Sequence, residues 1–171
     1  MNISIRRFAE QDIQCKVRWV NDERNNKYLH YDLPLSEDGT LEWFMSIKDR
    51  TDRADFTIIC EGEPAGVIGL LNIDSKNRKA EYYILVGEDK FRGKGVAYQA
   101  SKQLLRFAYE TLKLNKIYLY TEVENKPAQR LFEKLGFVIE GLLKEDLIYN
   151  GRKIDRYIYG LTLDNYHVGE I

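Results

Sequence analysis

Cysteine and histidine are scarce in this chain, which has two of each among 171 residues. Cys15 and Cys60 lie far apart and form no CxxC pair, and His30 and His167 are also widely separated, so no metal-ligand cluster can be written. We interpret both cysteines as packed thiols in a reducing compartment and expect no metal. We interpret His30 as a loop histidine rather than a second catalytic base.

Long hydrophobic runs are also lacking. The first ten residues, MNISIRRFAE, have no apolar core of the kind that marks a signal peptide, and no apolar stretch is long enough to cross a bilayer. No internal repeat, low-complexity tract or Pro/Gly/Ser linker divides the chain. We therefore expect one cytoplasmic domain over residues 1–171, with no membrane partner.

No excess of either charge is present, because 26 Lys and Arg residues face 27 Asp and Glu residues, for a formal net charge of -1. A nucleic-acid-binding domain normally has a clear basic excess, so this balance argues against binding to nucleic acid through overall charge. Apolar residues make up 44% of the chain, which is enough for a hydrophobic core without disulfide support.

Apolar periodicity predicts an α/β fold. Alternating patterns predict strands at 3–8, 55–60, 64–73, 79–86 and 116–123 and on both sides of the turn YNGR, 149–152, and helical spacing predicts helices over 10–20, 36–47, 97–113 and 125–136. Ser36 is the expected N-cap of the second helix. This order predicts a sandwich on a mixed, mostly antiparallel sheet of about seven strands, with helices on both faces.

The glycine-rich segment FRGKGVA, 91–97, stands between a predicted strand and a predicted helix. It fails the P-loop pattern because Lys94 is followed by Gly95 rather than by Ser or Thr, and it fails the Rossmann fingerprint because Tyr98 stands where glycine or alanine is needed. It satisfies R-x-x-G-x-[GA] in full, with the residues Arg92, Gly93, Lys94, Gly95, Val96 and Ala97.

Unpaired backbone N–H groups at the start of a helix attract an anion, and a chain without Cβ atoms can approach that anion closely. The segment therefore predicts a cradle for pyrophosphate, with Arg92 and Lys94 adding positive charge. The alternative is a solvated glycine turn that only connects a strand to a helix.

The RGKGVA loop, together with TEVENKPAQRLFEKLGF at 121–137, resembles the GNAT superfamily of acetyl-coenzyme A-dependent N-acetyltransferases. The resemblance runs from ISIRRF to YIYGLTL. Within the superfamily, the ending GFVIEGLLKEDLIYNGRKIDRYIYGL is similar to ribosomal-protein N-terminal, polyamine and amino-sugar acetyltransferases. The resemblance implies that Asn125, at the start of the helix after the fifth strand, contacts the cofactor arm.

The same resemblance implies a mechanism in which an amine attacks the thioester of acetyl-CoA directly in a ternary complex. Backbone groups near Leu85 and Val86 are then expected to pair with the pantetheine arm, and Glu81 is expected to be the base, directly or through water. The alternative for Glu81 is an ordinary strand carboxylate paired with Arg78 or Lys79.

Relatives often place a tyrosine as general acid where this chain has Phe132. Tyr118, Tyr120 and Tyr149 are the candidate substitutes, and the sequence does not choose among them.

The acceptor is expected to be a primary amine on a small molecule or an amino sugar. Trp19, Asn21 and Asp22 are candidate substrate residues because RWVNDERN enters a loop that faces the acceptor in similar proteins. An aromatic group could line the same pocket or simply pack in the core: Trp19, Tyr28, Tyr31, Trp43 and Phe44.

A protein N-terminal α-amino group is the second choice of acceptor. A polyamine ranks third, because the acidic residues are scattered along the chain. A non-catalytic CoA-binding sensor and a module with no ligand are the alternatives of other classes, and a homodimer is an open expectation.

Overall fold

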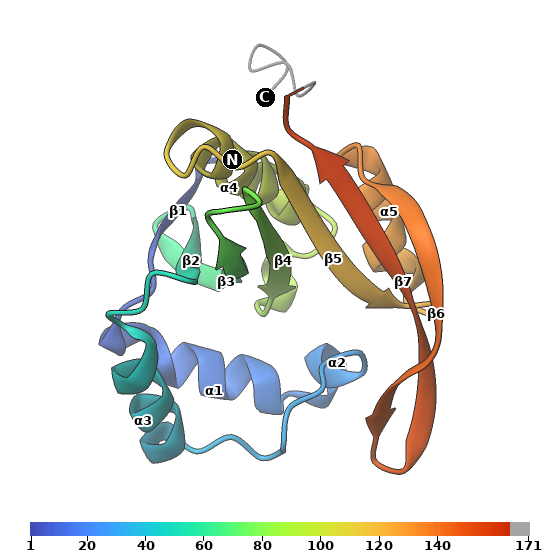
Figure 1. The fold of residues 1–171 in the computed structure, drawn as a ribbon. Coiled ribbons are helices and arrows are strands. Elements are labelled where there is room, and N and C mark those ends of the chain that lie inside the picture. Colours follow the sequence, from blue (N-terminus) through green and yellow to red (C-terminus); the bar gives the residue numbers. More distant parts are fainter. Residues whose placement is uncertain (165–171) are drawn as a thin grey trace.

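The computed structural model describes residues 1–164, in which seven strands form a single sheet with the order β1–β2–β3–β4–β5–β7–β6 (Figure 1). Every neighbouring pair is antiparallel except β4 and β5, which are parallel. The strands are β1 Ile3–Arg7, β2 Ala54–Cys60, β3 Glu63–Asp74, β4 Lys79–Val86, β5 Lys116–Glu122, β6 Val138–Tyr149 and β7 Arg152–Thr162. The predicted mixed, mostly antiparallel sheet of about seven strands is confirmed.

Within the described residues, five α-helices and two short 3-10 helices connect the strands. They are η1 Glu10–Asp12, α1 Ile13–Asn21, α2 Glu23–Asn26, α3 Glu37–Ile47, η2 Asp89–Phe91, α4 Val96–Glu110 and α5 Lys126–Lys134. The expected N-cap of α3 is confirmed, since Ser36 Oγ accepts a hydrogen bond from the Gly39 backbone N–H at 3.0 Å. The four-residue helix α2 has no prediction from the sequence, because ERNN contains no apolar residue to give it a period.

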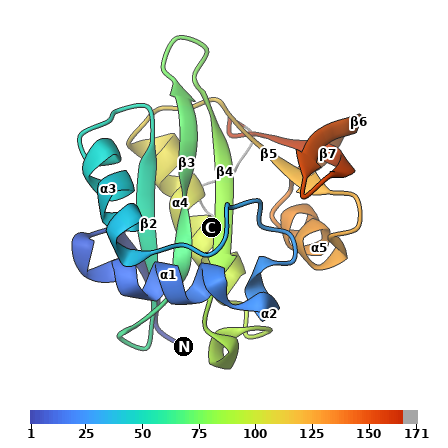
Figure 2. The same ribbon diagram turned by 90° about the horizontal axis from the view of Figure 1, so that it is seen from below.

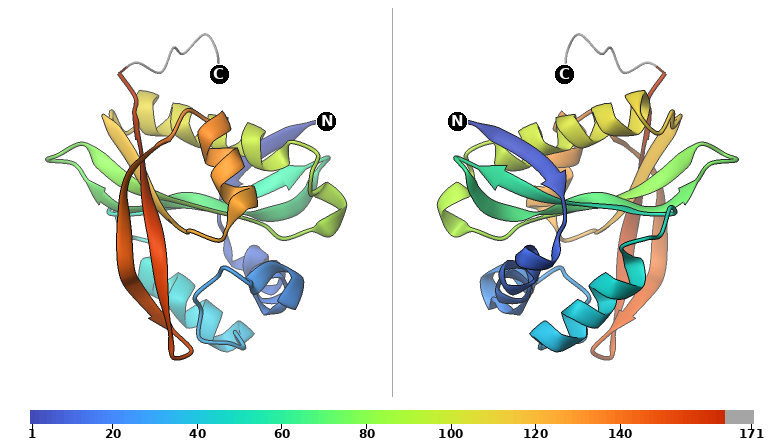
Figure 3. Two further views of the ribbon diagram at one scale, coloured as in Figure 1. Left: turned by 90° about the vertical axis from the view of Figure 1, so that its right-hand side faces the viewer. Right: turned by 90° about the vertical axis from the view of Figure 1, so that its left-hand side faces the viewer.

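The helices cover both faces of the sheet, as the sequence predicts (Figure 3). Helices α4 and α5 lie on one face, and α1, α2 and α3 lie on the other, where α1 crosses beneath the central strands (Figure 2). The larger core joins the sheet to α4 and α5 through residues such as Ile68, Leu104 and Phe137. A smaller core joins α1 to the opposite face around Phe8, Trp19 and Val67. Burial of these apolar surfaces is the main force that holds the layers together.

Strands β4 and β5 pair only at their beginnings. Lys79, Ala80 and Glu81 lie opposite Lys116, Ile117 and Tyr118, and no pairing to β5 continues beyond them. Strand β4 nevertheless runs on to Val86, paired with β3 on its other edge. The two central strands therefore separate, and the edge of β4 that faces β5 is left with backbone groups free to bind a ligand. No helix within residues 1–164 is long and apolar enough to cross a membrane.

Candidate active site

A cavity of about 430 Å³ opens where β4 and β5 separate. Its walls come from β4, β5, the segment after α2, the start of α5 and one residue of β7. The lining residues that carry the argument below are Tyr28, His30, Glu81, Leu85, Val86, Tyr120, Glu122, Asn125, Phe132 and Arg156. The cavity is large enough for a slender ligand arm and a small acceptor.

The glycine loop leads into α4, whose N-cap is Gly95. Gly93 and Gly95 have φ angles of +68° and +80°, in the left-handed region that glycine adopts without strain. A Cβ atom added at either position would have no protein atom within 4 Å, so that side of the loop is open to a ligand. The first-turn N–H groups of α4, with the exposed side chains of Arg92 and Lys94, fit the pyrophosphate of a nucleotide-bearing cofactor.

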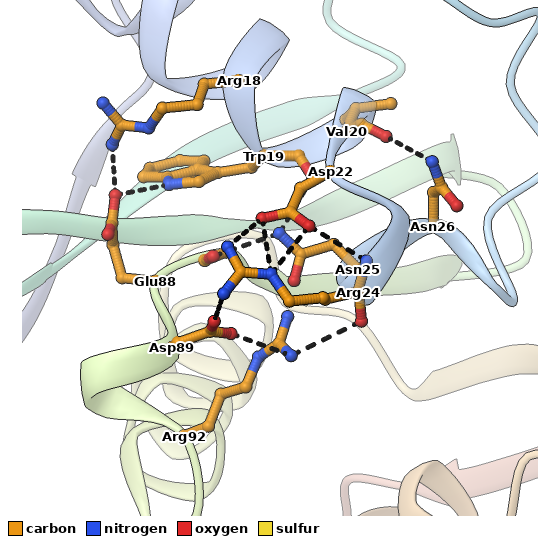
Figure 4. A network of polar contacts seen from close by, with 11 residues as sticks. Arg18, Trp19, Val20, Asp22, Arg24, Asn25, Asn26, Glu88, Asp89 and Arg92 are labelled. Carbon is orange, nitrogen blue, oxygen red and sulfur yellow. Dashed lines mark hydrogen bonds and ion pairs between the residues drawn. The ribbon is translucent and has the colours of Figure 1, made fainter.

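A network of charged groups joins this loop to helix α2 (Figure 4). Arg92 Nη1 lies 3.1 Å from Asp89 Oδ1 and donates to the Arg24 carbonyl oxygen at 3.4 Å. Arg24 pairs in turn with Asp89 and with Asp22. On the same side, Glu88 accepts from Trp19 Nε1 at 2.7 Å and pairs with Arg18. The segment that ends α1 is thus fastened to the loop that precedes α4.

Glu81 lies on β4 at the point where the two strands separate. Its side chain is partly buried, lines the cavity, and accepts a hydrogen bond from Asn72 Nδ2 at 2.9 Å. The structure gives Glu81 no ion pair with Arg78 or Lys79, the partners of the alternative interpretation; Arg78 donates to the Lys113 carbonyl instead. A carboxylate with an amide partner can accept a proton from an ammonium group.

The positions expected for the cofactor arm also line the cavity. Leu85 and Val86 stand on the part of β4 that has no β5 partner, opposite Val67 and Gly66 of β3. Asn125 is the N-cap of α5, and its Oδ1 accepts from the Ala128 N–H at 3.3 Å. The structure brings these residues together with Glu81, although the chain separates Asn125 from Glu81 widely.

The three candidate substrate residues near the front of the chain are not among the residues that line this cavity. Trp19 is buried against Gly87, where an added Cβ would lie 2.1 Å from the Trp19 ring. Asn21 exchanges two hydrogen bonds with the Leu35 backbone, at 2.9 and 2.7 Å, and Asp22 caps α2. Their side chains hold the segment between α1 and α3 in place. Of the aromatic group, Tyr28 lines the cavity, whereas Trp43 and Phe44 pack on Phe8.

Phe132 lines the cavity but has no proton to give, and its ring packs edge-on against Tyr82, with centroids 5.9 Å apart. The Tyr82 hydroxyl is bound to Ser101 Oγ at 2.6 Å, and burial raises the pKa of Tyr82. Of the three tyrosines considered as substitutes for the acid, only Tyr120 is among the cavity-lining residues. Tyr149 donates to the Tyr31 carbonyl at 2.8 Å.

One pair of residues in the cavity escaped the sequence analysis. His30 Nε2 lies 2.7 Å from Glu122 Oε1, and the Glu122 side chain is only 4% exposed. The interpretation of His30 as a plain loop histidine is thus incomplete, since its ring faces a buried carboxylate in the candidate site. Alternation along YLYTE could have placed Glu122 on the same strand face as Tyr118 and Tyr120, but nothing local in the sequence joins it to a residue 92 positions away.

The charge of the cavity wall is negative. Glu81 and Glu122 line it, and the one Lys or Arg among its lining residues, Arg156, is paired with Asp146 at 2.6 Å. Such a wall favours a positively charged guest, whereas the neighbouring N-terminus of α4 favours an anion. Residues 1–164 contain no group of three or more His, Cys, Asp and Glu side chains that could hold a metal ion; His167 lies outside the described residues.

Comparison with known proteins shows which family this chain matches. The family model for the acetyltransferase (GNAT) domain matches residues 2–138. The chain is 36% identical to spermidine N(1)-acetyltransferase of Escherichia coli over 106 residues, which is 62% of this chain but only 56% of that relative's length. It is 31% identical to a putative ribosomal N-acetyltransferase of Bacillus subtilis, over 94% of this chain and 91% of the relative.

A solved structure has the same fold. The spermidine N-acetyltransferase of Vibrio cholerae, in complex with CoA and spermine, superposes with a TM-score of 0.89 at 27% identity, covering 96% of this chain and 97% of that one. The chain thus has the fold of the GNAT acetyltransferases, as the sequence predicts. The chain belongs to the GNAT acetyltransferase family.

Proposed function

We propose that this protein transfers the acetyl group of acetyl-CoA to the primary amine of a small, positively charged molecule, by direct attack in a ternary complex. The observation that carries the proposal is the cavity between β4 and β5, which has an anion-binding helix N-terminus beside it and two carboxylates in its wall. The first feature suits the pyrophosphate of acetyl-CoA, and the second suits an ammonium group.

The residues present fit the cofactor. Arg92, Lys94 and the first turn of α4, from Val96 and Ala97, would hold the pyrophosphate, and the free edge of β4 at Leu85 and Val86 would pair with the pantetheine arm. Asn125 would contact that arm from the opposite wall. When bound, acetyl-CoA supplies an activated acetyl group. The chain holds the reactants together and provides N–H donors for the negative oxygen, and Glu81 removes a proton from the ammonium.

The two carboxylates also bear on the choice of acceptor. Two acidic residues that are far apart in the sequence line the same cavity, because Glu81 and Glu122 stand on the neighbouring strands β4 and β5. An acceptor with more than one positive charge fits such a wall, so we now place polyamines ahead of the other amines, although they ranked third on sequence alone. Relatives whose names state spermidine as their acceptor support the same choice. An amino sugar and a protein N-terminus remain the competing acceptors.

A direct test is the release of CoA thiol from acetyl-CoA at mildly alkaline pH, with a panel of amines. The panel contains polyamines, free and nucleotide-linked amino sugars, aminoglycosides and peptides with free N-termini. We expect turnover with small cationic amines and little with peptides. Turnover with peptides alone would overturn the acceptor assignment. No turnover with any amine, with acetyl-CoA binding measured separately, would favour the sensor alternative.

Two further expectations belong to the proposal. A cytoplasmic location agrees with the free thiols of Cys15 and Cys60, of which Cys60 is buried. Self-association is supported by exposed apolar side chains on the outermost strand β6, namely Val138, Ile139, Leu142 and Ile148, and by a relative described as dodecameric. We propose that one chain contacts another through this strand. We also propose that residues 1–171 form a single domain.

A further inference from the structure

We propose that His30, oriented by Glu122, accepts one of the two protons that the acceptor nitrogen loses during transfer. His30 is then a catalytic residue in addition to Glu81, and Glu122 is a positioning residue. The inference rests on the proposed function, because it assigns a role within that reaction. It starts from the 2.7 Å contact between His30 Nε2 and Glu122 Oε1 in the wall of the cavity.

The geometry leaves one imidazole nitrogen free for this role. A carboxylate only accepts hydrogen bonds, so the contact with Glu122 places the ring hydrogen on Nε2. Nδ1 then has a lone pair that can accept a proton. The His30 side chain is 24% exposed, whereas Glu122 is almost fully buried, so the histidine is the member of the pair that a ligand in the cavity can reach. A buried carboxylate that orients a histidine and stabilises its protonated form is a recurrent arrangement in catalysis.

The chemistry needs two proton acceptors. An acceptor of the form R–NH3+ loses one proton to become a neutral nucleophile. It loses a second proton as its lone pair forms the N–C bond and the C–S bond breaks, with that electron pair remaining on sulfur. One of these protons finally converts the thiolate to CoA thiol, and the other leaves to solvent. Glu81 on β4 takes the first proton, and His30, held against the end of β5, takes the second.

The chain also lacks the usual source of a proton for the thiolate, since Phe132 stands in the cavity wall. An imidazole changes charge between about pH 5 and 8, so it can both take up and release a proton at neutral pH. His30 can therefore pass the proton that it receives from nitrogen to the departing thiolate, through water. His30 is thereby an alternative to Tyr120, the one candidate acid from the sequence that lines the cavity, as the source of this proton.

A purely structural role explains the pair less well. The segment after α2 is already fastened by two hydrogen bonds between Asn21 and the Leu35 backbone, and by the bond from the Tyr149 hydroxyl to the Tyr31 carbonyl. Burying a carboxylate costs free energy unless it gains strong partners. The imidazole contacts Glu122 on β5 and packs edge-on against Tyr149 on β6. The other titratable or charged side chains that line the same cavity are Tyr28, Glu81, Tyr82, Tyr83, Tyr120 and Arg156.

The test uses His30→Gln in the full-length protein. Glutamine keeps an N–H that can bind Glu122, but it does not titrate. We expect kcat to fall about 10²-fold, with KM for the amine and affinity for CoA within about threefold of the wild type. The wild-type pH profile of kcat should have a limb on its acidic side that comes from His30, because protonated His30 cannot accept another proton. In His30→Gln this part of the pH profile should be absent.

Two variants separate chemistry from structure. Asn26→Ala removes a hydrogen bond from the Asn26 side chain to the Val20 carbonyl, which fastens the same segment, but it removes no proton acceptor, so it should keep kcat and the wild-type pH profile. Glu122→Gln keeps the shape of the pair without its charge and should lower kcat about tenfold. A readout without turnover comes from NMR: the imidazole resonance that His30→Gln removes should shift when the acceptor amine is added with CoA.

The outcomes are distinguishable. Wild-type turnover with unchanged turnover in His30→Gln would overturn the role of His30 and leave the proposed function standing. An equal loss in Asn26→Ala would show that the pair only fastens the segment. Absence of wild-type turnover across the amine panel would overturn both proposals.

Discussion

At the scale of single residues, the cavity holds two carboxylates that no lysine or arginine neutralises. Glu81 has Asn72 as its partner, and Glu122 has His30. A carboxylate in such a wall attracts an ammonium ion, so we propose that both residues favour a cationic acceptor and that Glu81 removes one of its protons. The network of Arg24, Asp89 and Arg92 is separate from them and fastens helix α2 to the glycine loop before α4 (Figure 4).

Replacement of Glu81 tests its role as the base. Glu81→Gln keeps the size of the side chain but removes its ability to accept a proton, so kcat should fall about 10²-fold while affinity for CoA stays unchanged. Turnover and CoA binding are measured separately. Glu140→Gln, which changes a carboxylate paired with Lys116 outside the cavity, is the matched control and should be fully active. Full activity of Glu81→Gln would remove Glu81 from the mechanism.

Lys16 gives a prediction about stability. Burial among aromatic side chains lowers the pKa of Lys16 to about 7, although its Nζ lies 3.2 Å from the centroid of the Trp43 ring. Above pH 7 the unfolded chain holds a proton at this position that the folded chain has lost. The contribution of Lys16 to the free energy of unfolding therefore rises between pH 7 and about 10.4.

Lys16→Met should remove this dependence. We expect the variant to be more stable than the wild type at pH 6, on the order of a few kcal/mol, and the difference to shrink as the pH rises to 9. Urea unfolding of both proteins at several pH values measures it. A difference that does not depend on pH would contradict the buried, easily deprotonated lysine.

At the scale of elements, the sequence predicted each strand and every helix except α2 and the 3-10 helix η2, and it also predicted particular turns and caps. The hairpin at Asn150-Gly151 is present with φ angles of +48° and +74°, and Asn125 caps α5. These signals are local, so they can be read from neighbouring residues. The separation of β4 from β5 and the meeting of His30 with Glu122 depend on contacts between distant segments, which no local pattern contains.

The anion-binding role of the glycine loop can be tested by comparison with a turn whose glycine has a similar positive φ angle. Gly95 and Gly62 have φ angles of +80° and +83°, and a Cβ at either position would touch no protein atom. Gly95→Ala and Gly62→Ala should therefore lose similar stability, about 1 kcal/mol each. Only Gly95→Ala should weaken CoA binding, by about tenfold, because only that Cβ would stand against the pyrophosphate.

Calorimetric titration with CoA and thermal unfolding without it measure the two effects. Equal CoA affinity in the two variants would contradict the assignment of the anion-binding cradle. A loss of affinity in both would show that the strain, rather than the position, is responsible.

At the scale of the whole molecule, the sheet ends in the long strand β6 (Figure 1). Four apolar side chains of this strand are exposed. A large exposed apolar patch on an edge strand favours contact with another chain. We expect the protein to self-associate and the variant Leu142→Lys with Ile148→Lys to be monomeric. Light scattering measures the mass. Met45→Lys, at an exposed apolar residue on α3, is the control and should leave the assembly intact. An unchanged mass of the β6 variant would place the interface elsewhere.

The most direct measurement for the account as a whole follows the acetyl group itself. The protein is mixed with isotopically labelled acetyl-CoA, with and without a cationic amine, and mass spectrometry records the protein and the amine. Direct transfer in the cavity between β4 and β5 predicts label on the amine, one CoA thiol released for each product, and no labelled protein in either sample. Label that accumulates on the protein before the amine is added, and then passes to the amine, would contradict direct attack in a ternary complex.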